Sequence, residues 1–377
     1  MRGREAGALY DLVALGMRAY VGARFSVRVF GAERLRLDPG TLVVATHRSD
    51  DDAPLLCGTL YVAARLWRRR RERVAFAVRD DLFEPGFFAG YPKGVPLPVR
   101  RLVWPLSIGA TLRDRLGCLP IRSATGMRLA QLLRGAPELP VERLPDDVRE
   151  AVARRAARLG IEAPGRGGDL LEPRFSDLLW RVVDRDEVTA PELLDPVWRA
   201  RAGAALDDLR GLVDLVRGGG RLLLFPEGRP SPDGAIGPLM PGFSTLVRRG
   251  RATRVQPVAL AYDPLAPGRT RAYVSVGESF VPQLDSLDET ILASLRRAMP
   301  LTAGQLAAEA ALDGGTLPPR VVASAVERAL AERRPVEPRL LDAGDRGRLA
   351  EAVFAARAAP ARAARLRREA ASAGVTS

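Results

Sequence analysis

The sequence predicts an α/β fold, a mixed sheet flanked by helices, with a helical insertion and a helical C-terminal appendage. Apolar runs rich in Val, Leu and Ala predict buried strands at residues 41–46, 73–78, 221–225, 254–262 and 271–277. Helical patterns separate several of these runs, as at residues 201–220, which end on three glycines that suit a helix stop. Strands that alternate with helices are typical of a largely parallel or mixed sheet.

Two long segments depart from this alternation. Residues 124–200 are charged, contain prolines and are mostly helical in pattern, whereas residues 291–377 are rich in Ala and Arg with helical periodicity. We therefore expect an N-terminal amphipathic helix at 1–27, a main domain at 28–290 with its helical insertion at about 124–200, and a helical appendage at 291–377. The first helix fits either packing on the core or a position in a membrane interface.

The charge balance narrows the classes of partner. The chain of 377 residues has a formal net charge of +13, and arginine supplies nearly all of the positive charge because Lys93 is the only lysine. A basic surface favours phosphate-bearing partners, whether nucleic acid, anionic lipid headgroups or phosphorylated small molecules. The two cysteines, Cys57 and Cys118, fit no metal-ligand spacing. No uncharged apolar run reaches about 18 residues, so we expect no membrane-spanning helix.

The first stretch with a chemical signal is "VVATHRSDDDAPLL", residues 43–56, which holds the only histidine, His47. A neutral imidazole is well suited to accept a proton near neutral pH, and a nearby carboxylate can fix its tautomer and stabilise the charge. The candidates are Asp50, Asp51 and Asp52. Asp50 or Asp51 can also cap the helix that follows, and Asp52 can return beneath the ring. By itself this pattern also fits a structural histidine before a solvated acidic run.

The second stretch is "LLLFPEGRPSPDG", residues 222–234, where an apolar strand stops abruptly before Glu227. Gly228 can take backbone angles closed to other residues, which lets a ligand approach the main chain. Arg229 can bind an anion through two parallel hydrogen bonds, and Ser231 lies in the same loop. A loop at the carboxyl end of a strand is where open α/β sheets bind ligands.

In this order the two stretches resemble the glycerolipid acyltransferases, a family typified by 1-acyl-sn-glycerol-3-phosphate acyltransferase. The family's first block holds a histidine and, after a gap of four residues, an aspartate, here His47 and Asp52, and Phe-Pro-Glu-Gly belongs to the third block. The similar blocks are residues 30–56, "LGCLPIRS" at 116–123, residues 222–234 and "VQPVALAY" at 255–262, with a further basic-acidic-Leu-Phe segment at 76–90. The resemblance covers roughly residues 28–123 and 201–280.

The resemblance implies acyl transfer from acyl-CoA or acyl carrier protein to the hydroxyl of a glycerophospholipid precursor, in phospholipid biosynthesis. The implied acceptor is 1-acyl-sn-glycerol-3-phosphate. His47 would take the proton from the acceptor hydroxyl, and Asp52 would orient His47 and stabilise the imidazolium. The implied substrate-binding residues are Arg122, Glu227, Gly228, Arg229 and Ser231. No metal and no cofactor beyond the thioester co-substrate are implied.

Among the implied binding residues, Arg122 and Arg229 would hold the acceptor's phosphate, and Glu227 would bind an acceptor hydroxyl or orient an arginine. The strand at 255–262 would line the acyl groove. These roles come from the resemblance alone.

Several positions depart from the family's pattern. Thr46 stands where the family often has Asn before the histidine. The second block usually has its arginine where this chain has Ser123, so Arg122 is a shifted candidate and Arg128 a second one. In the third block Arg229 directly follows the glycine and precedes a proline. These departures leave glycerol 3-phosphate, another lysophospholipid or a non-phosphorylated lipid open as acceptor.

A lipid acceptor implies contact with an anionic membrane surface, and we expect a peripheral protein at the cytoplasmic face. The first helix and residues 98–113 are candidates for that contact, since Arg100, Arg101 and Trp104 suit a headgroup layer, although this segment fits the core equally well. The alternative is a non-catalytic basic protein of the same fold that binds membrane or nucleic acid. Because the arginine-rich tail lacks interleaved aromatic residues, we expect no nucleic-acid partner.

Overall fold

The computed structural model describes residues 4–374, apart from residues 67, 69–72, 86–96, 104, 106, 189, 232–233, 266–267, 314–316 and 343–348. The chain divides into two compact units. The smaller unit is residues 77–212, and the larger unit combines residues 2–76 with residues 213–377. The division into parts at 1–27, 28–290 and 291–377 stays a prediction.

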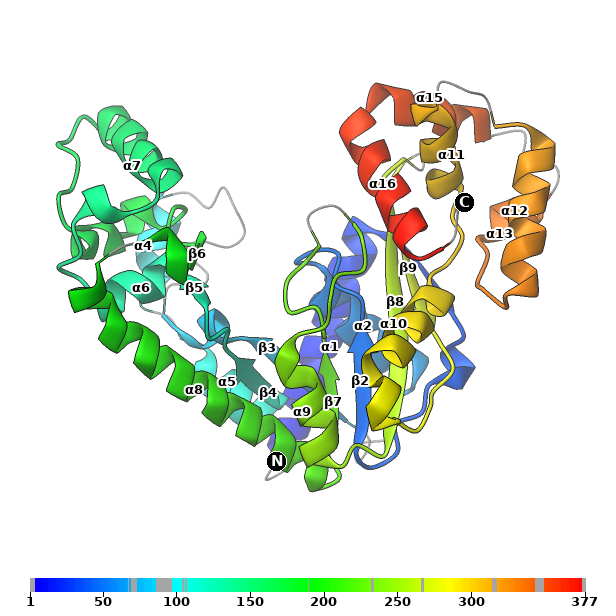
Figure 1. Ribbon diagram of the computed structural model, residues 1–377, viewed down its shortest axis with the longest axis horizontal. Helices are drawn as coiled ribbons and strands as arrows, with labels where there is room; N and C mark the ends of the chain where they lie inside the picture. Colours follow the sequence, from blue (N-terminus) through cyan, green and yellow to red (C-terminus); the bar gives the residue numbers. More distant parts are fainter. Residues whose placement is uncertain are drawn as a thin grey trace. The chain divides into compact units, whose positions relative to one another are not determined.

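One mixed sheet of seven strands has the order β1-β9-β8-β2-β7-β3-β4 (Figure 1). Its strands are β1 (Ser26–Phe30), β2 (Thr41–Ala45), β3 (Val74–Arg79), β4 (Cys118–Ile121), β7 (Arg221–Leu224), β8 (Arg254–Asp263) and β9 (Arg271–Val276). Strand β2 pairs in parallel with β7 and β8, and β3 pairs in parallel with β7. Strand β1 is parallel to β9, while β8 and β9 are antiparallel. The predicted α/β class with a mixed sheet is confirmed.

Strand β2 lies between β7 and β8, and each of its five residues is buried. A parallel strand covered on both faces reads in sequence as a continuous apolar run, which is why "TLVVA" was recognisable. Because β2, β7 and β8 are mutually parallel, their carboxyl ends meet at one edge of the sheet. The segments that follow these three strands are therefore brought together.

All five strands predicted from the sequence are present, and each end agrees with the prediction or differs from it by one residue. Strands β1 and β4 were not predicted. Strand β1 is an outer strand of the sheet in which apolar and polar residues alternate and two of five residues are exposed. Strand β4 has only four residues, one of them Pro120. Neither stretch carries the long apolar run on which the prediction relied.

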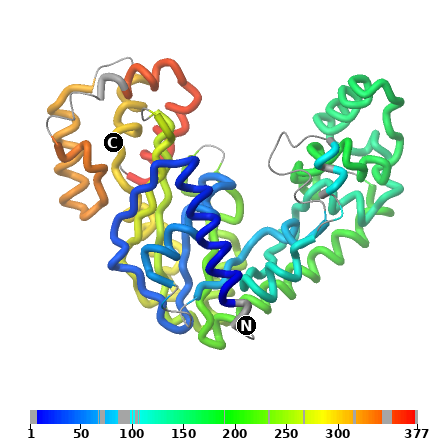
Figure 2. The backbone as a smooth tube through the Cα atoms, turned by 180° about the vertical axis from the view of Figure 1, so that it is seen from behind, coloured from blue at the N-terminus to red at the C-terminus, as the bar shows by residue number. Residues whose placement is uncertain are grey.

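In the larger unit, helices cover both faces of the sheet. Helix α1 (Arg4–Arg24) packs against α2 (Asp52–Ala63) and lies on the face toward the viewer in Figure 2. Helices α9 (Pro241–Gly250) and α10 (Leu287–Ala298) lie on the opposite face, toward the viewer in Figure 1. Helix α8 (Pro191–Arg217), most of which belongs to the smaller unit, precedes β7 and ends at the three glycines noted in the sequence.

The predicted C-terminal appendage is helical. Its helices are α11 (Ala303–Leu312), α12 (Pro319–Ala331), α13 (Pro338–Leu341), α15 (Leu349–Ala358) and α16 (Pro360–Ser372). Helices α11, α15 and α16 pack on one another and on the segment that follows β8. The buried residues of this cluster are Leu265, Ala308, Ala356, Ala363 and Leu366.

The smaller unit contains the predicted insertion and has a core of its own. Its helices are α4 (Leu97–Val103), α5 (Gly109–Leu116), α6 (Leu129–Gly135) and α7 (Asp146–Leu159). The insertion is mostly helical, as predicted, and also holds a two-stranded antiparallel sheet of β5 (Gly126–Arg128) and β6 (Val182–Asp184). Leu132, Phe175 and Trp198 are among its buried core residues.

Short 3-10 helices complete the described structure. They are η1 (Ala32–Arg34), η3 (Asp80–Phe83), η4 (Val141–Arg143), η5 (Gly167–Leu171), η6 (Pro173–Phe175), η7 (Arg185–Glu187) and η8 (Leu284–Ser286). None of the helices in the described part of the chain combines the length and the apolar character that crossing a bilayer requires.

The contact between α1 and α2 depends on Gly58. A Cβ at this position would lie 2.6 Å from the backbone N and 2.7 Å from the Cα of Arg18. We expect Gly58→Ala to force the helices apart and to lower the free energy of unfolding by about 1–3 kcal/mol, seen as a lower Tm in circular dichroism. Gly16→Ala in α1 is the matched control, because a Cβ there meets nothing within 4 Å. The control should gain up to about 1 kcal/mol, and equal Tm values for both variants would contradict the close packing.

Candidate active site

His47 lies just beyond the carboxyl end of β2, and its ring is held on two sides. Its Nδ1 is 2.8 Å from Oδ2 of Asp52. The imidazole also stacks on the ring of Phe225, with centroids 4.2 Å apart and planes inclined by 17°. The side chain is 13% exposed, so the ring reaches solvent at a limited area. Because Nδ1 faces the carboxylate, Nε2 is the nitrogen available to accept a proton.

Asp52 is the first residue of α2, and its carboxylate is fully buried. Besides His47, Oδ2 accepts hydrogen bonds from the backbone N–H groups of Arg48 (2.5 Å) and Ser49 (2.9 Å). Oδ1 accepts a hydrogen bond from the hydroxyl of Tyr262 at 2.7 Å. A buried carboxylate is tolerated when its oxygens are supplied with donors in this way. The structure thus brings together the two residues that the sequence predicts as the catalytic pair.

Asp51, one of the two residues expected to cap α2, occupies its N-cap position. The expected capping hydrogen bond is wrong, because the Asp51 side chain makes none. Its carboxylate instead accepts a hydrogen bond from the Tyr20 hydroxyl at 2.8 Å and pairs with Arg24 at 3.3 Å. Both partners belong to α1, so packing between the helices takes this carboxylate away from the α2 backbone. Asp52 remains as the anion in the first turn, where the helix dipole favours negative charge.

Glu227 joins the loop after β7 to the loop after β2. Its Oε1 accepts a hydrogen bond from the backbone N–H of His47 at 2.9 Å, and its Oε2 accepts one from Gly237 at 2.8 Å. Burial raises the pKa of this carboxyl, against the lowering effect of the Arg48 charge and of the two N–H donors. Both oxygens are therefore used within the protein, which makes Glu227 a brace for the backbone that carries His47.

The other predicted residues of the third block lie in the same loop. The backbone N–H of Ser231 donates to the carbonyl of His47 at 3.1 Å, and its hydroxyl accepts from the N–H of Gly234 at 3.1 Å. Gly228 has a φ of +75°, a conformation that explains the glycine. Arg229 is exposed to solvent next to it. The loop thus combines internal bracing with one exposed cation.

Sequence reasoning missed three contributors to this site. Tyr262 lies in the apolar strand expected to line the acyl groove, and the tyrosine at its end was the available signal. Burial, with the nearby Asp52 charge, raises the pKa of Tyr262 well above its usual value, so the hydroxyl stays protonated and donates. Thr46, the departure from the family's Asn, accepts a hydrogen bond from the N–H of Leu260 at 2.8 Å and so links β2 to β8.

Arg48 is the third residue missed, and an arginine beside a histidine gives no sequence signal of burial. It is 1% exposed. Its Nη1 donates hydrogen bonds to the carbonyls of Gly234 (2.8 Å) and Ala235 (3.0 Å). The side chain of Arg48 therefore binds the third-block loop, while the backbone N–H of the same residue donates to Asp52.

The arginines predicted from the second block belong to the smaller unit, where they face carboxylates. Nη1 of Arg122 donates to Asp208 at 2.6 Å. Burial raises the pKa of Asp208, and the Arg122 charge lowers it. Arg128 donates through Nε to Asp81 at 3.0 Å. Each of these two arginines thus neutralises a carboxylate of its own unit, and their phosphate-binding role stays a prediction.

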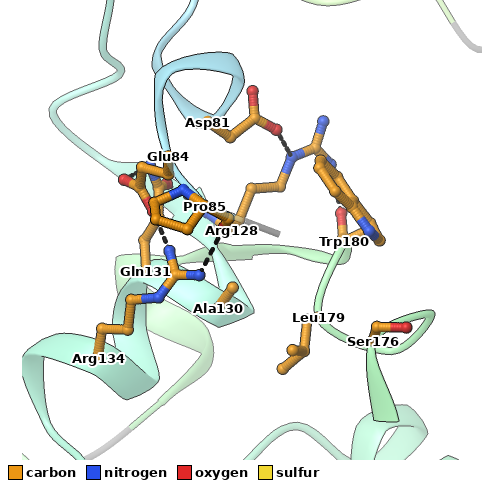
Figure 3. A pocket seen from close by; sticks show the side chains of 10 residues that line it. All are labelled: Asp81, Glu84, Pro85, Arg128, Ala130, Gln131, Arg134, Ser176, Leu179 and Trp180. Atoms are coloured by element: carbon orange, nitrogen blue, oxygen red, sulfur yellow. Dashed lines mark hydrogen bonds and ion pairs between the residues drawn. The ribbon is translucent and has the colours of Figure 1, made fainter. Parts of the chain in front are cut away.

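Figure 3 shows Arg128 at the wall of a small pocket, with its guanidinium turned to Asp81. On the same wall Arg134 is turned to Glu84, with which it forms an ion pair, and to the carbonyl of Pro85 at 2.9 Å. The pocket is thus lined by cations that already have partners.

The segments expected at a membrane interface expose apolar side chains. In α1, Leu12 is 68% exposed and Leu15 is 53% exposed. In α4, Leu102 is 75% exposed beside the exposed Arg101. Trp104 and the side chain of Arg100, the other two residues named for this contact, lie outside the described part of the chain.

Within the residues that the structure describes, no group of three or more His, Cys, Asp or Glu side chains is arranged to hold a metal ion.

The chain is similar to a solved structure, although no family model matches the chain and no curated protein matches its sequence. Among solved structures, the chain is similar to the 1-acyl-sn-glycerophosphate (LPA) acyltransferase PlsC from Thermotoga maritima. The sequence identity is 15%, the match covers 79% of this chain and 82% of that chain, and the TM-score is 0.39.

The hydrogen bond from Tyr262 to Asp52 can be tested by spectroscopy. Tyr262→Phe removes one donor from a buried carboxylate, so we expect the free energy of unfolding to fall by about 1–2 kcal/mol. We also expect the Nδ1–H proton signal of His47 to move in NMR spectra of histidine-labelled protein. The chain has a single histidine, so this signal needs no assignment.

Tyr10→Phe is the matched control for this test, because Tyr10 is also buried and donates to the carbonyl of Val74 at 3.4 Å. Its substitution should leave the His47 signal in place. An unchanged signal in Tyr262→Phe would contradict the assigned role of Tyr262.

Proposed function

We propose that the protein is an acyltransferase that moves a fatty acyl group from acyl-CoA or acyl carrier protein to a hydroxyl of a glycerophospholipid precursor. The proposed acceptor is 1-acyl-sn-glycerol-3-phosphate. The observation that carries the proposal is the pair of His47 and Asp52, which are 2.8 Å apart at the carboxyl edge of the sheet with Nε2 left to act. The order of the sequence blocks around this pair supports the same activity.

In the proposed reaction, Nε2 of His47 takes the proton of the acceptor hydroxyl as that oxygen attacks the thioester carbonyl carbon. The new C–O bond forms and the C–S bond breaks, and the imidazolium returns its proton to the departing thiolate. Asp52 stabilises the imidazolium and keeps Nδ1 protonated. The substrate's own hydroxyl is the nucleophile, so no covalent enzyme intermediate is required.

For the acceptor's phosphate, we propose Arg229, an exposed arginine of the site loop, which would exchange its present interaction for two parallel hydrogen bonds to the phosphate. The neighbouring Gly228 has a φ of +75° and packs against Met240, whose Sδ would clash with a Cβ at this glycine, so that side of the main chain is closed to a ligand. Arg122 would bind the phosphate only by giving up its hydrogen bond to Asp208.

The substrates are lipids, so we propose peripheral attachment to an anionic membrane at the cytoplasmic face. The exposed Leu12 and Leu15 of α1 suit insertion at the level of the headgroups, with arginines of the same helix near them. Leu102 and Arg101 of α4 offer a second contact of the same kind.

The catalytic assignment predicts the effect of two substitutions. His47→Ala should lower acceptor-dependent thiol release from palmitoyl-CoA about 10³-fold or more, because the general base is lost. Asp52→Asn should lower it about 10²-fold, since an amide cannot stabilise the imidazolium. Asp50→Asn, the same change on an exposed residue two positions away, is the control and should retain full activity.

Full turnover by His47→Ala would refute the assignment. If the wild type releases no thiol with lysophosphatidic acid, acyl carrier protein donors and other acceptors are tested next. Inactivity with all of them would support a non-catalytic basic protein instead.

The phosphate assignment predicts a different kinetic change. Arg229→Ala should raise KM for lysophosphatidic acid about tenfold or more and change kcat less, because it removes binding rather than chemistry. The control is monoacylglycerol, an acceptor without phosphate, whose KM should be the same in both proteins. An unchanged KM for lysophosphatidic acid would exclude Arg229 from phosphate binding.

A further inference from the structure

Helix α16 of the C-terminal appendage presents one polar face to the active-site loops. Arg365, Glu369 and Ser372 are spaced by four and three residues, which places them on the same side of the helix. Ala363 and Leu366 of the same helix are buried against α11, α15 and the segment after β8 (Figure 1). The helix is therefore anchored in the larger unit by its apolar residues, and its polar side chains face the active-site loops.

Arg365 links the two loops that form the site. Its Nη2 donates to the carbonyl of Arg48 at 2.5 Å and to the carbonyl of Ser231 at 3.3 Å. Arg48 directly follows His47, and the N–H of Ser231 holds the His47 carbonyl at 3.1 Å. One guanidinium thus joins the loop after β2, which carries the proposed base, to the loop after β7.

The third-block loop is fitted closely to the same helix face. Gly234 has a φ of +87°, and a Cβ there would lie 2.9 Å from the carbonyl oxygen of Arg365 and 3.3 Å from Cβ of Glu369. Two residues on, the N–H of Ile236 donates to the Ser372 hydroxyl at 3.1 Å. The loop could not keep this position if α16 were displaced.

Glu369 lies near a buried cation. Arg48 is 1% exposed, and its Nε and Nη2 have no hydrogen-bond partner in the described part of the chain. Its charge acts on the nearby carboxyls of Glu227 and Glu369, in the direction that lowers the pKa of each. Burial raises the pKa of Glu369 to about 7, and the charges of Arg48 and Arg365 act in the lowering direction.

We propose that Arg365 and Glu369 are positioning residues for the His47–Asp52 pair, so that α16 is a part of the active site. Arg365 joins the Arg48 carbonyl, next to His47 in the chain, to the Ser231 carbonyl of the third-block loop, and Glu369 packs beside Gly234, whose carbonyl binds the Arg48 guanidinium. The inference lies outside the sequence blocks and rests on the proposed function for its kinetic consequence, although its structural consequence is independent of any substrate.

The test uses the full chain with four substitutions in α16. Arg365→Ala removes the link, Arg365→Lys retains one cationic donor, and Glu369→Gln keeps shape without charge. Arg362→Ala is the control, because Arg362 is exposed on the same helix. The measurements are kcat and KM for acceptor-dependent thiol release, the His47 Nδ1–H signal by NMR, and Tm.

For Arg365→Ala we expect kcat to fall about 10- to 100-fold with KM changed less than about threefold, because the base is misplaced while the substrate still binds. Lysine should restore part of the loss. Glu369→Gln should also lower kcat, and the His47 signal should shift in these variants but not in Arg362→Ala. If Arg365→Ala fails to fold, Arg365→Lys and Glu369→Gln decide the question by the same measurements.

A lower Tm with unchanged kcat and an unchanged His47 signal would overturn the proposal, because α16 would then only stabilise the fold. A wild type without turnover would count against the proposed acyltransferase and leave the NMR comparison to decide positioning. Turnover that requires His47 but is indifferent to Arg365 and Glu369 would defeat this inference alone.

Discussion

The carboxylate of Asp52 is a negative charge held entirely out of water, and the shape of the site follows from the donors that it requires. An uncompensated buried ion costs several kcal/mol even after the protein relaxes. Here the compensation comes from the imidazole of His47, from the backbone N–H groups of Arg48 and Ser49, and from the hydroxyl of Tyr262. To deliver those donors the chain must turn sharply between β2 and α2. The same turn fixes the direction of the His47 ring.

Close to the Asp52 anion in the chain lies a buried cation, Arg48. Two further carboxyl groups, of Glu227 and Glu369, lie near that cation. Arg48 contributes its N–H to Asp52 and its guanidinium to the third-block loop, and its charge acts on the nearby carboxyls of Glu227 and Glu369. The alternation of signs explains how so many ionisable groups coexist in a dry region. It also makes the two loops mutually dependent, because removal of any one charge leaves another buried without compensation.

The central strands and the pairing of His47 with Asp52 could be predicted from the sequence. Strands β2, β7 and β8 are continuous apolar runs, and the spacing of His47 and Asp52 is short enough for local geometry to bring them together. Strand β1 was missed because an outer strand alternates polar and apolar residues. Asp51 does not cap α2 because Tyr20 and Arg24 of α1 bind its carboxylate, and the sequence around Asp51 does not reveal these distant partners. The contributions of Tyr262 and Arg365 depend on strand order and on the packing of α16, which no local pattern encodes.

The separation along the chain between the parts of the site has a consequence for how it forms. The imidazole and its carboxylate are neighbours in sequence, but Glu227 is 180 residues from His47, Tyr262 is 210 from Asp52, and Arg365 is 317 from Arg48. Closing such long loops is slow compared with forming local contacts. During synthesis, the base and its partner emerge early, and the brace from α16 emerges last. The site is therefore completed at the end of folding, so that a chain still being made carries its chemical groups without the geometry to use them.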